Sequence, residues 1–521
     1  MKKYCVNCYL AFMMLIFLLY YRNGYIDILR VKRGLFLNGT AVFLLWMFLI
    51  SIFEILINGK ERERREKRDR SRLWKSGYGY LGYLILLEIA VLVISTLGAE
   101  HRRDVFLGLT GRYLGSLAMV MGWITVLLIA KYVRWNVVLN WIFLIGVGIV
   151  WLLQILNTCG IDPLGIQAQT AEWMRLYFIS TIGNVNFNAG FDCMTLPVIM
   201  VFYTVCRERF SRMIYGIALC LGSAAAVCCR SDSVYLGIGI GFLALLACGL
   251  RHWEYLIRCV EGMTLSLFSM LLTALFIRYR IGGDALLGLG IPVSDIRFAA
   301  VEILCVGVLW ALILGGKKGC FWKNESQRER CLRIWRRVYG CLLILMGGIF
   351  LLGMILVNKT DLLPVQKMPF YWMHLTDEWG SSRGYVWKRS LEIFKELPLF
   401  EKLFGCGMNS TGYLLNDYFG EEMQARFSVK FIDAHNEGLQ YLLSIGIVGT
   451  MLYFAILLGI FVSAVKAIRA GNENAMFAVC AIPAFLAQGL VNNPQIVTTP
   501  LLFIGLGIFW NIMGDREGME I

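Results

Sequence analysis

The stretch Gly34–Ile57 reads GLFLNGTAVFLLWMFLISIFEILI, and the next nineteen residues, Asn58–Ser76, read NGKERERREKRDRSRLWKS. The first run is apolar and longer than the roughly 20 residues that a helix needs to cross a bilayer. The second is dominated by Lys, Arg and Glu, and basic segments of this kind mark the cytoplasmic side of a membrane protein. The pair therefore predicts a transmembrane helix that ends in a cytoplasmic loop.

The same alternation continues along the chain. Of its 521 residues 58% are hydrophobic and 17% are charged, whereas globular chains are only about 45–50% apolar. This composition predicts an all-α polytopic membrane protein with about fourteen (12–14) transmembrane helices. The expected spans are 8–21, 34–57, 77–97, 107–130, 136–157, 184–206, 211–229, 234–250, 260–277, 296–314, 337–357, 437–463, 475–492 and 499–513.

Orientation follows from the basic loops. If the N-terminus is cytoplasmic, the basic segments 58–76 and 315–336 lie on that side together with most of the loop Lys and Arg residues. The bias predicts that both termini are cytoplasmic. The loop 22–33 is an exception, because this topology places Arg22, Arg30, Lys32 and Arg33 on the opposite side.

Charge and cysteine content narrow the classes further. The net charge of +14 is explained by the cytoplasmic loops, so we expect no nucleic-acid partner. Most of the sixteen cysteines lie in apolar runs, where they act as small hydrophobes. Cys5 and Cys8 form one CxxC, but no second pair completes four zinc ligands, so no metal site and no cofactor are expected.

Three parts are predicted: a transmembrane bundle over 1–357, a large extracytoplasmic loop over 358–436, and C-terminal transmembrane helices over 437–521. A long loop between spans is usually functional or disordered. This loop is rich in aromatic residues, so we expect it to fold back onto the membrane surface. Its aromatic side chains either sit at the interface or stack on sugars.

Within this loop, SSRGYVWKRSLEIFKELPLF (Ser381–Phe400) has a helix signature, with Ser381 or Ser382 as the cap and a proline at its end. Helical spacing places Arg383 on one face with Trp387, Leu391 and Phe394. An arginine on a packed face needs a partner. That partner is either a carboxylate of the protein or an anionic group of a ligand, for example a phosphate.

Two glycines follow in LFGCGMNSTGY (Leu403–Tyr413), at Gly405 and Gly407. They allow tight backbone turns. The pattern fits a turn between two outer helices better than a phosphate-binding loop, because a single GxG has little specificity.

The loop ends in FIDAHNEGLQYLLSIGIVG (Phe431–Gly449), where Asp433 or Asn436 is expected to cap a helix that starts near Glu437. His435 then lies at the edge of the membrane. A neutral imidazole there can accept a proton near neutral pH, with Asp433 or Glu437 to orient it. The alternative is a histidine that only bonds a backbone carbonyl, and His374 in the same loop is a competing base.

These segments resemble the O-antigen ligase and polymerase family of membrane glycosyltransferases. AHNEGLQYLLSIGIVG is similar to the family's HN-x-x-L-Q…G-x-x-G block, with His435 on its histidine. The Ser381 segment resembles the R-x-x-x-W…P-L…G-x-G block, with Arg383 and Trp387 in place. STIGNVNFNAGFDCMTLP (Ser180–Pro197) resembles a G-N-P-N-x-x-A-G span start, of which Asn184 and Asn186 match.

One departure concerns CCRSDSVYLG (Cys228–Gly237), at the place where the family usually has Ser-Arg. Aligned on Leu236, Asp232 occupies the position of the family arginine. The nearest arginine is Arg230. Either Arg230 replaces it from two residues away, or the donor is bound differently.

The resemblance implies a fold like that of other lipid-linked (GT-C-type) glycosyltransferases and a location in the bacterial cytoplasmic membrane. It also implies transfer of glycans from undecaprenyl diphosphate to a sugar hydroxyl on the outer face. No Asp-x-Asp pair occurs in the outer segments, which favours a metal-independent reaction with arginines on the diphosphate. Direct displacement would invert the anomeric centre.

The residue roles implied are these. His435 is the expected base. The diphosphate binders are Arg383, Arg230 and Arg175, and the supporting residues are Asp433, Glu437, Trp387, Asn184 and Asn186.

The partners implied are the lipid-linked donor, a glycan or lipid-glycan acceptor and membrane lipids. The sequence does not choose between polymerase and ligase. A flippase for lipid-linked glycans is the alternative, although no internal repeat is apparent. A membrane scaffold would explain neither Arg383 nor His435.

Overall fold

The computed structural model describes residues 1–75, 79–281, 324–359 and 374–514, with the short pieces 286–287, 291–292 and 307–308. These residues are helical almost throughout, which confirms the predicted all-α class. The bundle contains α1 (Lys2–Ala11) with the π-helix η1 (Phe12–Phe17), α2 (Ile28–Lys75), α3 (Gly79–Gly98), α4 (Arg102–Leu107), α5 (Ser116–Tyr132), α6 (Val137–Thr158), α7 (Val185–Val205), α8 (Arg209–Cys228), α9 (Asp232–Gly249), α10 (Trp253–Phe276) with η3 (Ile277–Ile281), α12 (Glu325–Lys359), α16 (Glu437–Arg469), α17 (Met476–Gly489) and α18 (Thr499–Gly514).

Shorter elements connect or cover these helices. They are η2 (Glu172–Tyr177), the strands β1 (Phe178–Ile179) and β2 (Gly183–Asn184), β3 (Leu286–Leu287) and β4 (Ile291–Pro292), the helices α13 (Trp379–Glu396), α14 (Leu399–Phe404) and α15 (Thr411–Phe427), and η6 (Glu473–Ala475). Strands β1 and β2 form an antiparallel hairpin that leads directly into α7.

Nine of the helices in the described part of the chain are long and apolar enough to cross a membrane, and α5 and α18 are shorter apolar helices. The protein is therefore an all-α polytopic membrane protein. Each predicted span that falls on described residues overlaps a helix. The predicted span 296–314 lies outside the described residues apart from 307–308, so the number of about fourteen spans stays a prediction.

One predicted span begins in the wrong place. The sequence predicts a span over 107–130, whereas the helix α5 starts only at Ser116. Gly108 and Gly111 adopt left-handed φ angles of 63° and 60°, which end α4 and turn the chain back. The residue after Gly111 is Arg112, whose charge makes it unsuited to a membrane interior.

Asparagines start several of the spans. The side chain of Asn136 accepts from the N–H of Leu139 at 3.0 Å and caps α6. Asn184 caps α7 through the N–H of Asn186 at 2.9 Å. These caps satisfy backbone donors at helix ends that would otherwise lack partners.

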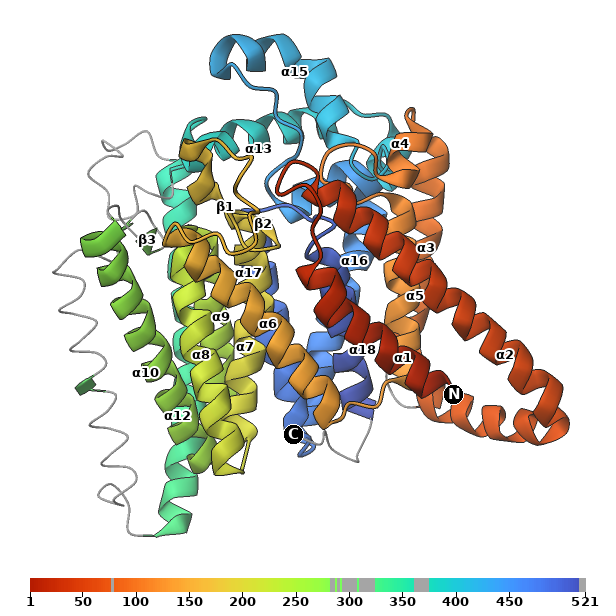
Figure 1. Ribbon diagram of the computed structural model, residues 1–521, viewed down its shortest axis with the longest axis vertical. Coiled ribbons are helices and arrows are strands. Elements are labelled where there is room, and N and C mark those ends of the chain that lie inside the picture. The colour runs from red at the N-terminus through yellow and green to blue at the C-terminus, as the bar shows by residue number, and fades with distance from the viewer. Residues whose placement is uncertain are drawn as a thin grey trace.

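The segment 374–436 folds as a layer over one end of the bundle, with α13 lying across that end and α15 stacked on it (Figure 1). We call α13, α14 and α15 the cap layer. It has its own small apolar core, which includes Tyr385, Ile393 and Met423 and reaches Leu443 of α16. The labelled N-terminus lies in the opposite half of Figure 1.

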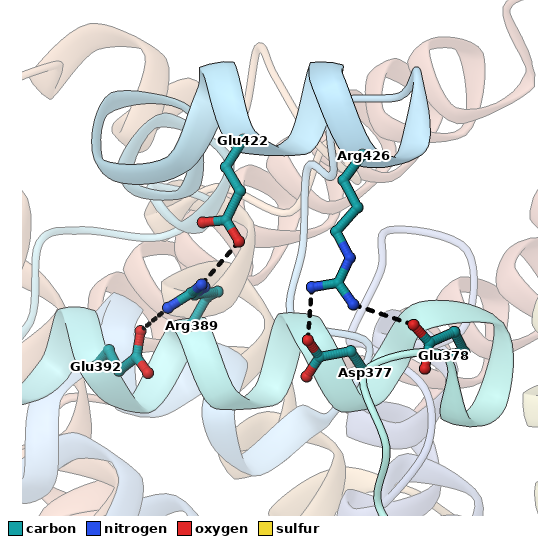
Figure 2. A network of polar contacts seen from close by, with 6 residues as sticks. All are labelled: Asp377, Glu378, Arg389, Glu392, Glu422 and Arg426. Atoms are coloured by element: carbon teal, nitrogen blue, oxygen red, sulfur yellow. Dashed lines mark hydrogen bonds and ion pairs between the residues drawn. The ribbon is translucent and has the colours of Figure 1, made fainter.

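Ion pairs hold the cap layer together (Figure 2). Arg389 of α13 pairs with Glu392 of the same helix and with Glu422 of α15, the latter at 2.7 Å. Arg426 of α15 reaches the start of α13, where it pairs with Asp377 at 2.6 Å and Glu378 at 3.0 Å. Both guanidinium groups use two carboxylates each.

Candidate active site

Residues from distant parts of the chain meet beneath the cap layer around the carboxylate of Asp433. Arg112 binds this carboxylate through Nε at 2.9 Å and through its terminal Nη2 at 2.8 Å. The side chain of Asp433 is only 2% exposed. A buried carboxylate of this kind is expected to have a charged, hydrogen-bonded partner, and Arg112 is that partner.

His435 lies on the other oxygen of the same carboxylate. Oδ1 of Asp433 accepts the backbone N–H of His435 at 3.1 Å, and it lies 3.4 Å from the imidazole Nδ1. The tight turn gives His435 a φ of 47°, which is unusual for a residue with a side chain. With a carboxylate beside Nδ1, the favoured neutral tautomer carries its proton there and leaves Nε2 as the acceptor.

The electrostatic surroundings keep this imidazole neutral. Burial lowers the pKa of His435 below its usual 6.5. The carboxylate of Asp433 raises this pKa, whereas the guanidinium groups of Arg383 and Arg112 lower it. Near pH 7 the group is therefore unprotonated and able to accept a proton.

Arg383 comes from the cap layer. Gly380, Ser381 and Ser382 adopt left-handed φ angles of 61°, 61° and 70°, so the regular part of α13 begins at Arg383. Burial lowers the pKa of Arg383, and the carboxylates of Asp433 and Asp232 raise it.

The contacts of Arg383 are few for a buried cation. A terminal N–H donates to the carbonyl of Gly380 at 2.8 Å, and the buried Nε has no hydrogen-bond partner among the described residues. Arg383 interacts electrostatically with both Asp433 and His435. Its Nε–H remains available as a hydrogen-bond donor for a ligand.

The loop before α9 approaches from the bundle. Arg230 has a φ of 47°, and its buried Nε and Nη2 have no partner within the described residues. The next residue, Ser231, donates to the side chain of Asn186 at 2.8 Å, which fixes this loop to the start of α7. Asp232 begins α9 within electrostatic reach of Arg383, so the residue at the place of the family arginine is a carboxylate that faces an arginine from the cap layer.

Other candidate residues face elsewhere. Glu437 is buried and accepts from Tyr453 at 2.7 Å, so Asp433 rather than Glu437 adjoins His435. Arg175 lies exposed and donates to the carbonyl of Thr170 at 3.4 Å, and no hydrogen bond or ion pair among the described residues joins it to the others. Asn436 provides the cap of α16, through the N–H of Leu439 at 2.9 Å.

The predicted face of the cap-layer helix is partly wrong. Trp387 lies half-buried, one turn after Arg383, and its ring centroid is 5.2 Å from that of Trp379. Leu391, expected on the same packed face, is 44% exposed. The buried face instead carries Tyr385, Val386, Ser390 and Ile393, because α13 packs against α15 as well as against the bundle.

The two glycines of the GCG segment have a packing role. The N–H groups of Cys406 and Gly407 donate to the carbonyls of Leu443 and Ser444 at 2.9 and 2.8 Å. A Cβ on Gly405 would lie 2.3 Å from the backbone of Ser444. The contact lies where α16 is broken at Gly446, which has a φ of 68°. These amides are therefore occupied and are not free for a phosphate.

Arg112 was not predicted from the sequence. It lies inside the apolar run that was expected to form a span, and its partner Asp433 is 321 residues away. The signal was an arginine directly after Gly111 in a predicted span, where a charge costs about 2.5–3.5 kcal/mol on insertion scales. For metals, no group of three or more His, Cys, Asp or Glu ligands gathers in the part of the chain that is described.

The comparisons with known proteins agree with this geometry. Residues 282–454 match the model of the O-antigen ligase family. The matched range contains Arg383, Asp433 and His435 and extends into α16. No curated protein matches the chain. This part of the chain is therefore similar to O-antigen ligases, which supports a membrane protein of the glycan ligase or polymerase kind.

Proposed function

We propose that this protein transfers or polymerises undecaprenyl-diphosphate-linked glycan units onto a sugar hydroxyl at the outer face of the bacterial cytoplasmic membrane. One observation carries the proposal. Arg383, with a spare buried donor, lies in electrostatic reach of the neutral imidazole of His435, and Asp433 lies near both. A cation that binds a leaving group and a base that activates a nucleophile are the two elements such a transfer requires.

The arginines act on the leaving group. As the glycosidic bond breaks, the lipid diphosphate gains negative charge. Arg383 and Arg230 both have buried N–H donors without partners among the described residues, and guanidinium groups bind phosphate oxygens through paired hydrogen bonds. Stabilising this charge lowers the barrier directly, because it develops only in the transition state. We leave Arg175 outside the proposed site.

His435 acts on the acceptor. Its Nε2 takes the proton from the sugar hydroxyl as the oxygen attacks the anomeric carbon, and Asp433 stabilises the imidazolium that forms. Arg112 holds Asp433 in place from the far side of the carboxylate. Direct attack on the anomeric carbon inverts its configuration, and no carboxylate is assigned as a nucleophile.

The orientation is part of the proposal. The N-terminus and the basic start of α12 lie in the half of the bundle opposite α13 and α15 (Figure 1). Basic segments favour the cytoplasmic side. The cap layer and the proposed site would then face the outside, where the lipid-linked glycan is presented.

The test uses purified protein in nanodiscs with an undecaprenyl-diphosphate-linked oligosaccharide and measures its transfer or lengthening. His435→Ala is expected to lower the rate by about 10²–10⁴-fold, because a positioned base contributes that much. His374→Ala and Arg175→Ala are matched controls that retain the rate. Full activity of folded His435→Ala protein would remove His435 from the mechanism, and inward accumulation of lipid-linked units in cells lacking the protein would favour the flippase.

A further inference from the structure

A groove lies between the first helical segment, α1 with η1, and α2, and none of its lining residues belongs to the proposed site. It has a volume of about 920 Å³ and is lined mainly by residues from these helices and from the loop that joins them. Arg22 and Arg30 lie at the end formed by the loop, while Phe12, Phe43 and Trp46 line the part farther along. The groove thus has a cationic end and an apolar body.

The two arginines at the cationic end are not explained by the fold. The loop 22–33 carries four basic residues on the side where basic residues are disfavoured. Lys32 is buried and donates to the carbonyls of Phe17 and Leu18, and Arg33 donates to the carbonyl of Leu107.

Arg22 and Arg30, in contrast, are exposed and have no hydrogen bond or ion pair among the described residues. The nearby carboxylate of Asp27, which also lines the groove, accepts from the backbone and side-chain N–H groups of Asn23 at 3.4 and 3.1 Å. The end of the groove therefore offers two guanidinium groups that have no partner among the described residues, and guanidinium groups are well suited to a phosphate.

The length of the groove limits what fills its apolar body. Arg30 and Trp46 both line it and are sixteen residues apart on α2, which corresponds to about 24 Å along a helix. A groove of this length accommodates a long isoprenoid chain that lies along α2.

The cationic end lies close to the proposed site. Arg33 binds the carbonyl of Leu107, and the loop that follows Leu107 carries Arg112. The joining loop of the groove also contacts the segment before α7, through Tyr25 and the carbonyl of Ser180 at 2.8 Å. A glycan attached to a phosphate at Arg22 and Arg30 would therefore begin next to the segments that form the proposed site.

We propose that this groove binds the polyprenyl phosphate part of a second lipid-linked glycan, with its phosphate on Arg22 and Arg30 and its chain between η1 and α2. The choice of this lipid rests on the proposed function. Two carrier-linked glycans in one enzyme are what a polymerase uses, because both its donor and its growing chain are attached to the carrier. The groove thereby favours polymerase over ligase.

The test measures binding of undecaprenyl phosphate to the full-length protein in phosphatidylcholine nanodiscs by native mass spectrometry. The double variant Arg22→Gln/Arg30→Gln is expected to lower the affinity of one bound lipid at least tenfold. Arg103→Gln, a change of an exposed arginine outside the groove, is the control and leaves binding unchanged.

A second variant tests the apolar body independently. Gly34 lines the groove, and a Cβ added there meets no atom within 4 Å, so Gly34→Phe can direct its ring into the groove from an open position. It is expected to remove the same bound lipid. Gly148 on α6 is equally open, and Gly148→Phe is the matched control that keeps it.

Two results overturn the inference: binding that neither variant changes, and displacement of the lipid by an equal concentration of phosphatidylglycerol, which identifies an ordinary phospholipid site. Binding does not require catalysis, so the two proposals fail separately. If His435→Ala retains both transfer and lipid binding, the base assignment fails and the groove remains. If transfer depends on His435 while both groove variants bind normally, only the groove fails.

Discussion

Two arginines of one helix, six residues apart, have opposite surroundings. Arg389 of α13 is neutralised by Glu392 and Glu422 in the network of Figure 2 and lies over the ring of Phe419 at 4.6 Å. Arg383 of the same helix bonds only a backbone carbonyl and has a buried Nε without a partner in the described residues.

The difference separates a structural role from a binding role. The carboxylates of Glu392 and Glu422 neutralise the charge of Arg389 and hold α13 on α15, although its Nε, like that of Arg383, has no partner among the described residues. Arg383 has no ion pair among the described residues, so both its charge and its buried donor are left for a ligand, and a buried donor without a partner costs about 1–3 kcal/mol. The same argument applies to Arg230, whose buried donors also lack partners in the described part of the chain.

The largest expected effect distinguishes Arg383 from Arg389. Arg383→Ala should lower the transfer rate by about 10²–10³-fold, as the loss of one donor to a developing negative charge does elsewhere. The thermal stability should hardly change, since Arg383 forms no ion pair with a carboxylate in the described part of the chain. Arg389→Ala should keep the rate within about threefold of wild type. Equal losses of activity in both variants would contradict the division into structural and binding arginines.

We expect the carboxylate of Asp433 to affect catalysis and that of Glu422 to affect only structure. A pH–rate profile between pH 5 and 9 measures this difference. Neutral His435 is the active form, so the rate is full above its pKa and is lost as the pH falls through a value below 6.5. Asp433 raises that pKa; Asp433→Asn should therefore move the acidic limb to lower pH and reduce the plateau about tenfold. Glu422 pairs with Arg389, so Glu422→Gln should leave the pH–rate profile unchanged. An unshifted limb in Asp433→Asn would disconnect Asp433 from the base.

A smaller effect concerns the stability of the cap layer. Arg389→Ala should make α15 open more easily by about 1–2 kcal/mol, through the loss of partly screened ion pairs and of the contact with Phe419. Hydrogen exchange of the amides of Thr411–Phe427 measures this opening. Arg383→Ala should leave that exchange unchanged, and faster exchange there would give Arg383 a structural role as well.

The smallest effect should come from salt. Raising the ionic strength from about 0.05 to 0.5 M shortens the range of charge interactions, so the pairs of Arg426, which is 38% exposed, should weaken and exchange in α15 should rise modestly. The pair of Arg112 and the 2% exposed Asp433 should be little affected, and the acidic limb of the rate profile should not move. A salt-sensitive limb would indicate that water reaches this carboxylate.

The sequence predicted the positions of the helices better than the tertiary contacts between distant segments. Hydropathy reports which segments contact lipid, so the runs matched helices. It carries no information on which loops converge, and for this reason the pair of Arg112 and Asp433 was missed although His435 and Arg383 were singled out. Helical spacing likewise gave one face for α13, whereas a helix packed on two sides buries Tyr385 and exposes Leu391.

The break in α16 has a consequence for exchanging parts between relatives. The sequence boundary between loop and span falls at Asn436, but the strand-like contact of Cys406 and Gly407 with Leu443 and Ser444 lies beyond it. Gly446 allows this contact, since a Cβ there would lie 2.3 Å from the carbonyl oxygen of Leu403. A chimera that replaces the cap layer with that of a relative therefore needs its junction after Gly446. The first turns of α16 then come from the same protein as the cap layer that they contact.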